Sequence, residues 1–131
     1  MPSRVYPTVA ETIETQRLLI DEFGGLHGVR DMGPLESAVL RPQSGYYTNV
    51  IDEATVLMES LANNHAFLDG NKRISFVMAD VTLRANGYFL DFEPLAAHKF
   101  ITEALGKNEF RFPMIREWLA SIAKPAGDED D

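Results

Sequence analysis

The sequence predicts an all-α fold, a compact bundle of about six helices with a small flap-like loop. Three observations predict it. Apolar residues recur at helical spacing along most of the 131 residues. Several of these stretches begin or end at recognisable cap residues. The alternation of apolar and polar residues that is typical of strands is nearly absent.

The N-terminal part predicts two helices followed by a loop. Thr8 and Glu11 have the spacing of a capping box, and Gly24-Gly25 ends the first helix. The apolar residues between these ends recur on one helix face: Val9, Ile13, Ile20 and Phe23. A short second helix is expected from Gly33-Pro34 to Leu40, because proline tolerates the first helical position, where its missing amide would have no partner. Residues 41–48 are rich in helix-breaking residues and predict the flap-like loop.

The two strongest predicted helices lie in the middle of the chain. The first runs from Asp52 or Glu53 to Asn64, and its inward side chains are expected to be Ala54, Leu57, Met58 and Leu61. The second ends at Asn86-Gly87, and its apolar stripe consists of Ile74, Val77, Met78, Val81 and Ala85.

The last third of the chain predicts a short extended piece over residues 88–90 and two further helices. One opens at Glu93-Pro94 and the other at Phe112-Pro113. The last helix carries one apolar stripe, formed by Ile115, Trp118, Leu119 and Ile122. We expect one domain over residues 1–124 and an acidic, disordered tail over residues 125–131.

Charge and composition exclude several classes of protein. The 12 basic and 20 acidic residues give a net charge of −8, which argues against a surface that binds nucleic-acid phosphates. The chain has no cysteine, which excludes disulfides, thiol nucleophiles and zinc sites with cysteine ligands. No apolar run approaches the roughly 18 residues that a membrane span needs. Because the N-terminus also lacks the apolar region of a signal peptide, we expect a cytoplasmic protein.

One short segment concentrates groups that suit a nucleotide ligand. Residues 65–73 read His-Ala-Phe-Leu-Asp-Gly-Asn-Lys-Arg and lie between the two strongest predicted helices. Free amides at a helix N-terminus bind phosphate oxygens, and Gly70 lets the backbone approach them closely. Asn71 can add an amide donor. Lys72 and Arg73 can neutralise the charge that builds up during phosphoryl or nucleotidyl transfer.

Two other residues of this segment suit the transfer step. Asp69 is a natural ligand for Mg²⁺, which uses few protein carboxylates and relies on substrate phosphates. His65 precedes the turn, and an imidazole can accept a proton from an attacking hydroxyl near neutral pH. Phe67 is expected to enter the core and fix the loop. The alternative is structural, because Asp-Gly-Asn is a common turn and Lys-Arg pairs often lie on a solvated face.

Residues 65–73 resemble the Fic motif, HxFx(D/E)GN(G/K)R, and more narrowly its Doc (death-on-curing) branch, in which Lys replaces the second Gly. Residues 24–38 are similar to the N-terminal block typical of Doc proteins, and residues 84–88 match the end of the helix after the motif. The resemblance runs from about Pro7 to Ala123. It implies a compact α-helical Fido fold. It also implies transfer of a phosphate-containing group from a nucleotide to a protein hydroxyl.

The resemblance implies a role for each motif residue. His65 would be the general base, and Asp69 would hold the metal ion, Mg²⁺. Gly70 and Asn71 would help to form the anion-binding nest. Arg73 would pair with phosphate.

Two departures from the AMP-transferring pattern favour a kinase. Lys72 stands where that pattern has Gly and would crowd the usual nucleotide pose, and Phe76 stands where it has a second Arg. Doc-type proteins share the Lys and transfer the γ-phosphate of ATP. The resemblance therefore implies phosphorylation of Ser or Thr in a translation GTPase of the elongation factor Tu class, which would block translation. Adenylylation on the same scaffold and a catalytically silent antitoxin-binding module are the alternatives.

Fic proteins are commonly silenced by a helix that carries (S/T)xxxE(G/N), whose Glu meets the motif Arg. The nearest match here, Thr-Val-Leu-Met-Glu-Ser at residues 55–60, lacks the final Gly or Asn. We therefore expect the inhibitory helix to come from another chain, a cognate antitoxin. We expect neither nucleic acid nor a membrane as a direct partner.

Overall fold

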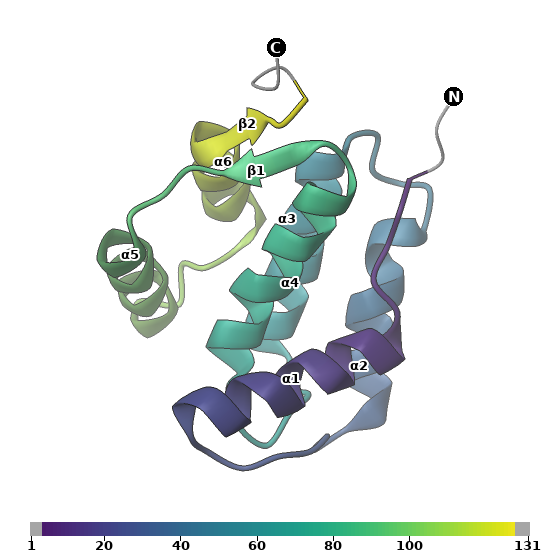
Figure 1. The fold of residues 1–131 in the computed structure, drawn as a ribbon, viewed down its shortest axis with the longest axis vertical. Helices are drawn as coiled ribbons and strands as arrows, with labels where there is room; N and C mark the ends of the chain where they lie inside the picture. Colours follow the sequence, from purple (N-terminus) through teal and green to yellow (C-terminus); the bar gives the residue numbers. More distant parts are fainter. Residues whose placement is uncertain (1–3, 128–131) are drawn as a thin grey trace.

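The computed structural model describes residues 4–127 and confirms the all-α fold (Figure 1). Residues 128–131 of the predicted tail lie outside this range, whereas Pro125 belongs to a strand. In chain order the described elements are α1 (Val9–Phe23), α2 (Met32–Leu40), the 3₁₀ helix η1 (Arg41–Gln43), α3 (Val50–Asn63), α4 (Asn71–Ala85), β1 (Tyr88–Leu90), α5 (Pro94–Gly106), α6 (Phe112–Ile122) and β2 (Ala123–Pro125).

Helices α3 and α4 pack along each other through the middle of the molecule (Figure 1). The side chains of α3 that were predicted to face inward are all fully buried. On α4, Ile74 and Met78 are buried as their spacing predicts, but Val81 is 41% exposed. Ala79 and Leu83 are buried in its place, because residues of α4 pack into both core clusters.

The core consists of two clusters, and α3 and α4 contribute to both. One cluster joins α2 to these helices and includes Leu35, Val39, Leu61, Phe67 and Ile74. The other joins α5 and α6 to them and includes Leu83, Ile101, Phe110, Ile115 and Leu119. Full burial of each large apolar side chain stabilises the fold by about 1.5–3 kcal/mol. Phe67 is 1% exposed, which confirms that it enters the core.

Cap residues determine where the helices begin. The capping box of α1 is confirmed, because Glu11 N donates to Thr8 Oγ1 at 3.1 Å and Thr8 N donates to Glu11 Oε1 at 2.8 Å. Asn49 caps α3 by accepting from the amide of Asp52 at 2.9 Å. For this reason α3 begins slightly earlier than predicted, at Val50.

The segment predicted as a flap-like loop starts with η1 and is then held by aromatic and ionic contacts. Tyr47 stacks on Phe112 with ring centroids 6.3 Å apart, and Arg41 donates to the Tyr47 hydroxyl at 3.2 Å. Tyr46 is 82% exposed beside them. The loop is therefore pinned at Arg41 and Tyr47, and it presents Tyr46 to the solvent.

The small sheet lies at the end of α3 and α4 that is far from α1 (Figure 1). β1 confirms the predicted extended piece over residues 88–90 and pairs antiparallel with β2, with Tyr88 opposite Pro125. The pairing of β2 was not predicted, because three residues show too little alternation to be recognised as a strand. No helix within residues 4–127 is long and apolar enough to cross a membrane.

Candidate active site

The predicted motif forms one wall of a cleft of about 920 Å³. The fold brings this wall together where the α3–α4 loop runs into the first turn of α4, at the end of these helices next to α1. Every residue that the sequence predicted for the site lines the cleft: His65, Asp69, Gly70, Asn71, Lys72 and Arg73.

The opposite wall of the cleft was not predicted. It comes from α5 and the residues before it, and it is mostly apolar, formed by Phe92, Pro94, Ala97, His98, Ile101 and Leu105. Phe76 of α4 also lines the cleft and packs edge-on against Phe92, with ring centroids 4.9 Å apart. The apolar spacing of α5 could not reveal this role, because the same pattern serves a core and a cleft equally well.

Gly70 adopts a conformation that strongly favours glycine. Its φ is +77°, and a Cβ atom at this position would lie 3.3 Å from Ile20 Cδ1. Gly70 provides no side-chain cap for α4. Within residues 4–127, no hydrogen bond engages the backbone amides of Asn71, Lys72 and Arg73. These amides and the positive end of the α4 dipole are therefore available to an anion.

The side chain of Asn71 braces the loop that carries the motif. Its Oδ1 accepts from Phe67 N at 3.0 Å, and its Nδ2 donates to Phe67 O at 3.0 Å. Phe67 also forms an isolated bridge with Val29, in the loop between α1 and α2. Asn71 thus fixes the shape of the turn through its side chain, while its backbone amide is one of the open amides at the start of α4.

Asp69 is held by α1 and by the loop that follows it. Its carboxylate Oδ2 accepts from Leu26 N at 3.1 Å, and its backbone carbonyl accepts from Gln16 Nε2 at 3.1 Å. Gln16 is 2% exposed and also donates to Leu26 O at 3.2 Å, while its Oε1 accepts from Gly28 N at 3.3 Å. Sequence reasoning missed Gln16, although its position midway between Thr12 and Ile20 on one helix face was a signal of burial.

The donor set around Asp69 fits a metal ion that arrives with its substrate. Asp69 Oδ2 is engaged by Leu26, and no partner for Oδ1 is seen within residues 4–127. The same residues contain no group of three or more acidic or histidine side chains that could hold a metal ion by itself. One carboxylate is sufficient for Mg²⁺ when phosphate oxygens complete its coordination.

The two cations of the motif reach different neighbours. Lys72 Nζ donates to Thr102 Oγ1 of α5 at 3.0 Å, so that this side chain links the two walls of the cleft. The guanidinium carbon of Arg73 lies 4.1 Å from the centroid of the Phe23 ring. The spacing of α1 placed Phe23 on the apolar face, but its side chain is 53% exposed.

His65 is exposed and adopts a left-handed conformation, with φ at +52°. Such a conformation costs a non-glycine residue on the order of 1 kcal/mol, and the neighbouring backbone holds it. Ala66 O accepts from the amides of Arg30 and Asp31 at 2.8 and 3.1 Å. No hydrogen bond to the imidazole is seen within residues 4–127, which leaves the ring free to take a proton from a ligand in the cleft.

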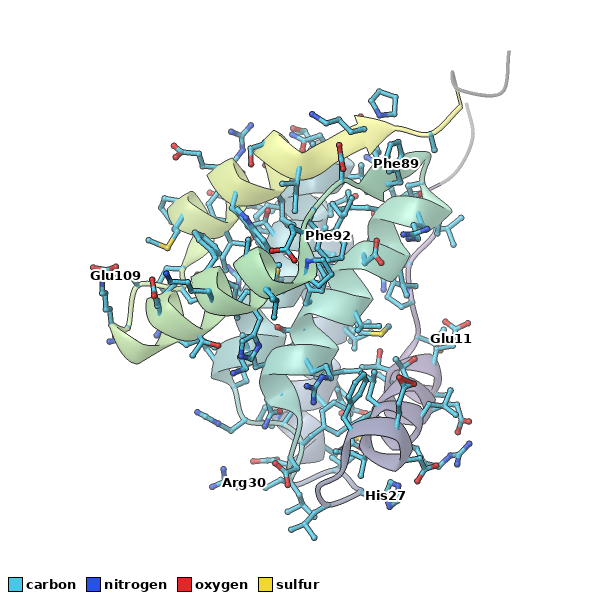
Figure 2. The ribbon with its side chains drawn as sticks, turned by 60° about the vertical axis from the view of Figure 1, so that its left-hand side comes forward. Glu11, His27, Arg30, Phe89, Phe92 and Glu109 are labelled. Atoms are coloured by element: carbon cyan, nitrogen blue, oxygen red, sulfur yellow. The ribbon has the colours of Figure 1, made fainter. Side chains whose placement is uncertain are left out.

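Another histidine in the N-terminal block has a structural role. His27 Nε2 lies 2.7 Å from Asp21 Oδ1, and it does not line the cleft. Figure 2 shows His27 and Arg30 at the lower tip of the molecule, whereas Phe92 of the apolar wall lies nearer its centre.

Glu59, in the segment that partly matches a silencing helix, does not contact the motif arginine. Its Oε1 accepts from Arg41 Nη1 at 2.9 Å, and its Oε2 accepts from Phe112 N at 2.7 Å. Glu59 therefore joins η1 and the start of α6 to α3. The motif arginine is not blocked by this glutamate.

Comparison with known proteins agrees with this site. Residues 6–83 match the Fic/DOC family, a span that includes the whole motif and ends before α5. The chain is also 42% identical over 93 residues to toxin Doc of Mycolicibacterium smegmatis, which covers 66% of this chain and 72% of that protein. From the motif, the fold and this similarity, the chain belongs to the Fic/DOC family.

Proposed function

We propose that the protein is a toxin of the death-on-curing type that transfers the γ-phosphate of ATP to a Ser or Thr hydroxyl of a target protein. One observation carries the proposal. One cleft is lined by the imidazole of His65, which has no hydrogen-bond partner among residues 4–127, by the N-terminal turn of α4, and by the cations Lys72 and Arg73. The similarity to a protein named toxin Doc supports the biological role.

The residues of the cleft can divide the work of phosphoryl transfer. The α4 amides, Lys72 and Arg73 bind and orient the polyphosphate and neutralise its charge. His65 accepts the proton of the attacking hydroxyl while the new O–P bond forms, and the bond from the γ-phosphorus to ADP breaks. Asp69 would hold Mg²⁺, which supplies further positive charge to the phosphates when bound.

The distribution of polar and apolar residues favours transfer of the γ-phosphate over transfer of AMP. The cationic groups and the open amides come from the same short segment as His65, whereas the other lining residues are mostly apolar or aromatic, with Asn63, His98 and Asn108 as the polar exceptions. Phe76, at the position of a second Arg in the AMP-transferring pattern, packs against Phe92 and Trp118 with centroids 4.9 and 5.8 Å away. A nucleotide with its base on this aromatic surface would present its terminal phosphate to His65.

The target and the inhibitor are proposed from the family. We propose a translation GTPase of the elongation factor Tu class as the target. We also propose that a cognate antitoxin supplies the inhibitory helix to the cleft, because Glu59 of this chain is already hydrogen-bonded to Arg41 and Phe112. Expression of the chain alone is then expected to arrest growth, and co-expression of a small neighbouring gene product that binds it is expected to restore growth.

Labelled ATP tests the proposed reaction. The purified protein is added to a bacterial extract with ATP labelled at either the γ- or the α-phosphate, in parallel with His65→Ala. Transfer of the γ-label to protein, lost in His65→Ala, is expected. Transfer of the α-label would identify an adenylyltransferase. If no label is transferred in either case, or if His65→Ala transfers as much as the wild type, the protein is a binding module or uses another site.

A further inference from the structure

Phe23 is a large apolar side chain that does not enter the core. It is the last residue of α1, and its side chain is 53% exposed, as is that of Leu18 on the same helix. Burial therefore does not explain its position. Its one described aromatic or cationic contact within residues 4–127 is with the guanidinium of Arg73, which lies 4.1 Å from the ring centroid.

We propose that Phe23 is a positioning residue that orients Arg73 for phosphate, an inference that rests on the proposed function. A guanidinium stacked on a ring keeps its N–H groups in a plane parallel to the ring, so that their outer edge stays open to a bidentate contact. Arg73 makes this contact and also lines the cleft. The stack restricts a long, flexible side chain before the ligand arrives, which reduces the entropy lost on binding.

The charges at the end of α1 favour the same arrangement. Phe23 sits at the C-terminus of α1, where the negative end of the helix dipole attracts a cation. An acidic partner for Arg73 would occupy the N–H groups that phosphate needs. The carboxylate of Asp21, two residues before Phe23 in the chain, is engaged by Arg17 and His27 instead. It accepts from Arg17 at 3.1 Å and lies 2.7 Å from His27. The ring thus holds Arg73 without competing for its donors.

The position of Phe23 relative to the motif is fixed by separate contacts. Gly24 N donates to Ile20 O at 2.8 Å and closes the last turn of α1. Gln16 on the same helix donates to Asp69 O at 3.1 Å, and so ties α1 to the motif itself. These contacts hold the end of α1, and with it the backbone of Phe23, next to the motif.

Conservative variants distinguish an effect of the aromatic ring of Phe23 from an effect of side-chain size alone. MgATP binding is measured by calorimetry, and KM and kcat are measured from transfer of the γ-label, for Phe23→Leu, Phe23→Tyr and Leu18→Ala. Phe23→Leu is expected to raise Kd and KM for ATP about two- to fivefold, with little change in kcat, because an exposed cation–π contact is weak. Phe23→Tyr, which keeps the aromatic face, and Leu18→Ala, matched in exposure, are expected to bind as the wild type does.

A double-mutant cycle completes the test. If Phe23 acts through Arg73, Phe23→Leu has no further effect on MgATP affinity in an Arg73→Ala background. An unchanged or tighter affinity in Phe23→Leu, while Arg73→Ala binds more weakly, overturns the inference, and tighter binding would mean that the ring sequesters Arg73. An unchanged affinity in Arg73→Ala itself refutes the proposed phosphate site, and this inference with it.

Discussion

The two walls of the cleft are held in place by different forces. The wall made by the α3–α4 loop and the start of α4, hereafter the motif wall, is tied to α1 and its following loop by hydrogen bonds from Gln16 and Leu26. The opposite wall, hereafter the α5 wall, consists of α5 and the residues before it, and α5 itself is joined to another helix by one hydrogen bond within residues 4–127, from Lys72 to Thr102. Apolar contacts hold the rest of α5, including Phe100 stacked on Trp118 at 4.7 Å.

This difference indicates which side of the cleft is set before a ligand binds. Hydrogen bonds are directional and fix the motif wall in one geometry, which saves the cost of ordering it on binding. Apolar contacts are not directional, so that α5, which stands to one side of α3 and α4 in Figure 1, can adjust to the ligand. The family match follows the same division, since it covers residues 6–83 and ends before α5.

The largest expected effect comes from removing a core side chain under the motif wall. Phe67→Ala is expected to lower the free energy of unfolding by about 3–5 kcal/mol, because Phe67 is fully buried and the neighbouring backbone is bonded to Asn71. Phe100→Ala, under the α5 wall, is expected to lower it less, because Phe100 is only partly buried. Urea unfolding of both variants makes the comparison. An equal or larger loss in Phe100→Ala contradicts the division into a fixed and an adaptable wall.

The next effect comes from the buried amide that ties α1 to the motif. Gln16→Met keeps the shape of the side chain but leaves backbone groups of Leu26, Gly28 and Asp69 without their partner. We expect a loss of about 1–3 kcal/mol in the free energy of unfolding. Amide hydrogen exchange is expected to rise in residues 24–30 and 65–70 but not in α5.

A neighbouring residue provides the control for this variant. Thr15→Ala removes a side chain whose one hydrogen bond within residues 4–127 is to Glu11 O on its own helix. Its exchange pattern in the motif wall is expected to match the wild type. If Gln16→Met matches it too, the hydrogen bonds of Gln16 do not fix the motif wall.

Helix ends could be predicted from the sequence because their signals are local. The capping box of Thr8 and Glu11 and the start of α5 after Glu93 depend on neighbours a few residues away. The motif could be placed for the same reason, between two amphipathic helices. The strand β2 could not be predicted, because it is only three residues long and pairs with β1 in a distant part of the chain.

Contacts between distant residues account for what the sequence left open in the site. The spacing of α1 put Phe23 on an apolar face, but its ring is half exposed and contacts Arg73 on another helix. Asn71 was expected to offer an amide donor to a ligand, and the hydrogen bonds of its side chain to Phe67 were not foreseen. Both partners become visible only when α1, the loop and α4 are placed together.

A smaller, pH-dependent change in stability is expected at Tyr6, which contacts α3 through Glu53. Glu53 of α3 is 4% exposed and accepts from Tyr6 Oη at 2.9 Å and from Arg4 Nε at 2.6 Å. Burial, followed by the hydrogen bond to Glu53, raises the pKa of Tyr6 above its ordinary value. The stabilisation from this neutral hydroxyl is therefore present below about pH 10 and is lost as the pH rises through the folded-state pKa.

Tyr6→Phe measures this contribution. The variant is expected to be less stable than the wild type by about 1 kcal/mol at pH 8, and the difference is expected to shrink above pH 10. The other tyrosines are common to both proteins and cancel. Urea unfolding across this range makes the measurement. A difference that grows with pH contradicts the assigned direction of the pKa change.

The smallest effect is expected at the link between the two walls. Thr102→Val keeps the size of the side chain and removes its hydrogen bond to Lys72 Nζ. Because this contact is exposed, we expect a change of about 0.5 kcal/mol or less in the free energy of unfolding. Amide exchange in α5 is expected to become faster while residues 65–70 stay protected. Faster exchange in both walls would show that they open as one unit.

The most direct test of the account is a crystal structure of the wild-type protein with Mg²⁺ and a non-hydrolysable ATP analogue. We expect the terminal phosphate to lie on the amides at the start of α4, within reach of the His65 imidazole, and the base to lie on the aromatic surface near Phe76 and Phe92. A nucleotide bound with its α-phosphate beside His65 would contradict the proposed γ-phosphate transfer. A nucleotide bound away from α4 would contradict the site itself.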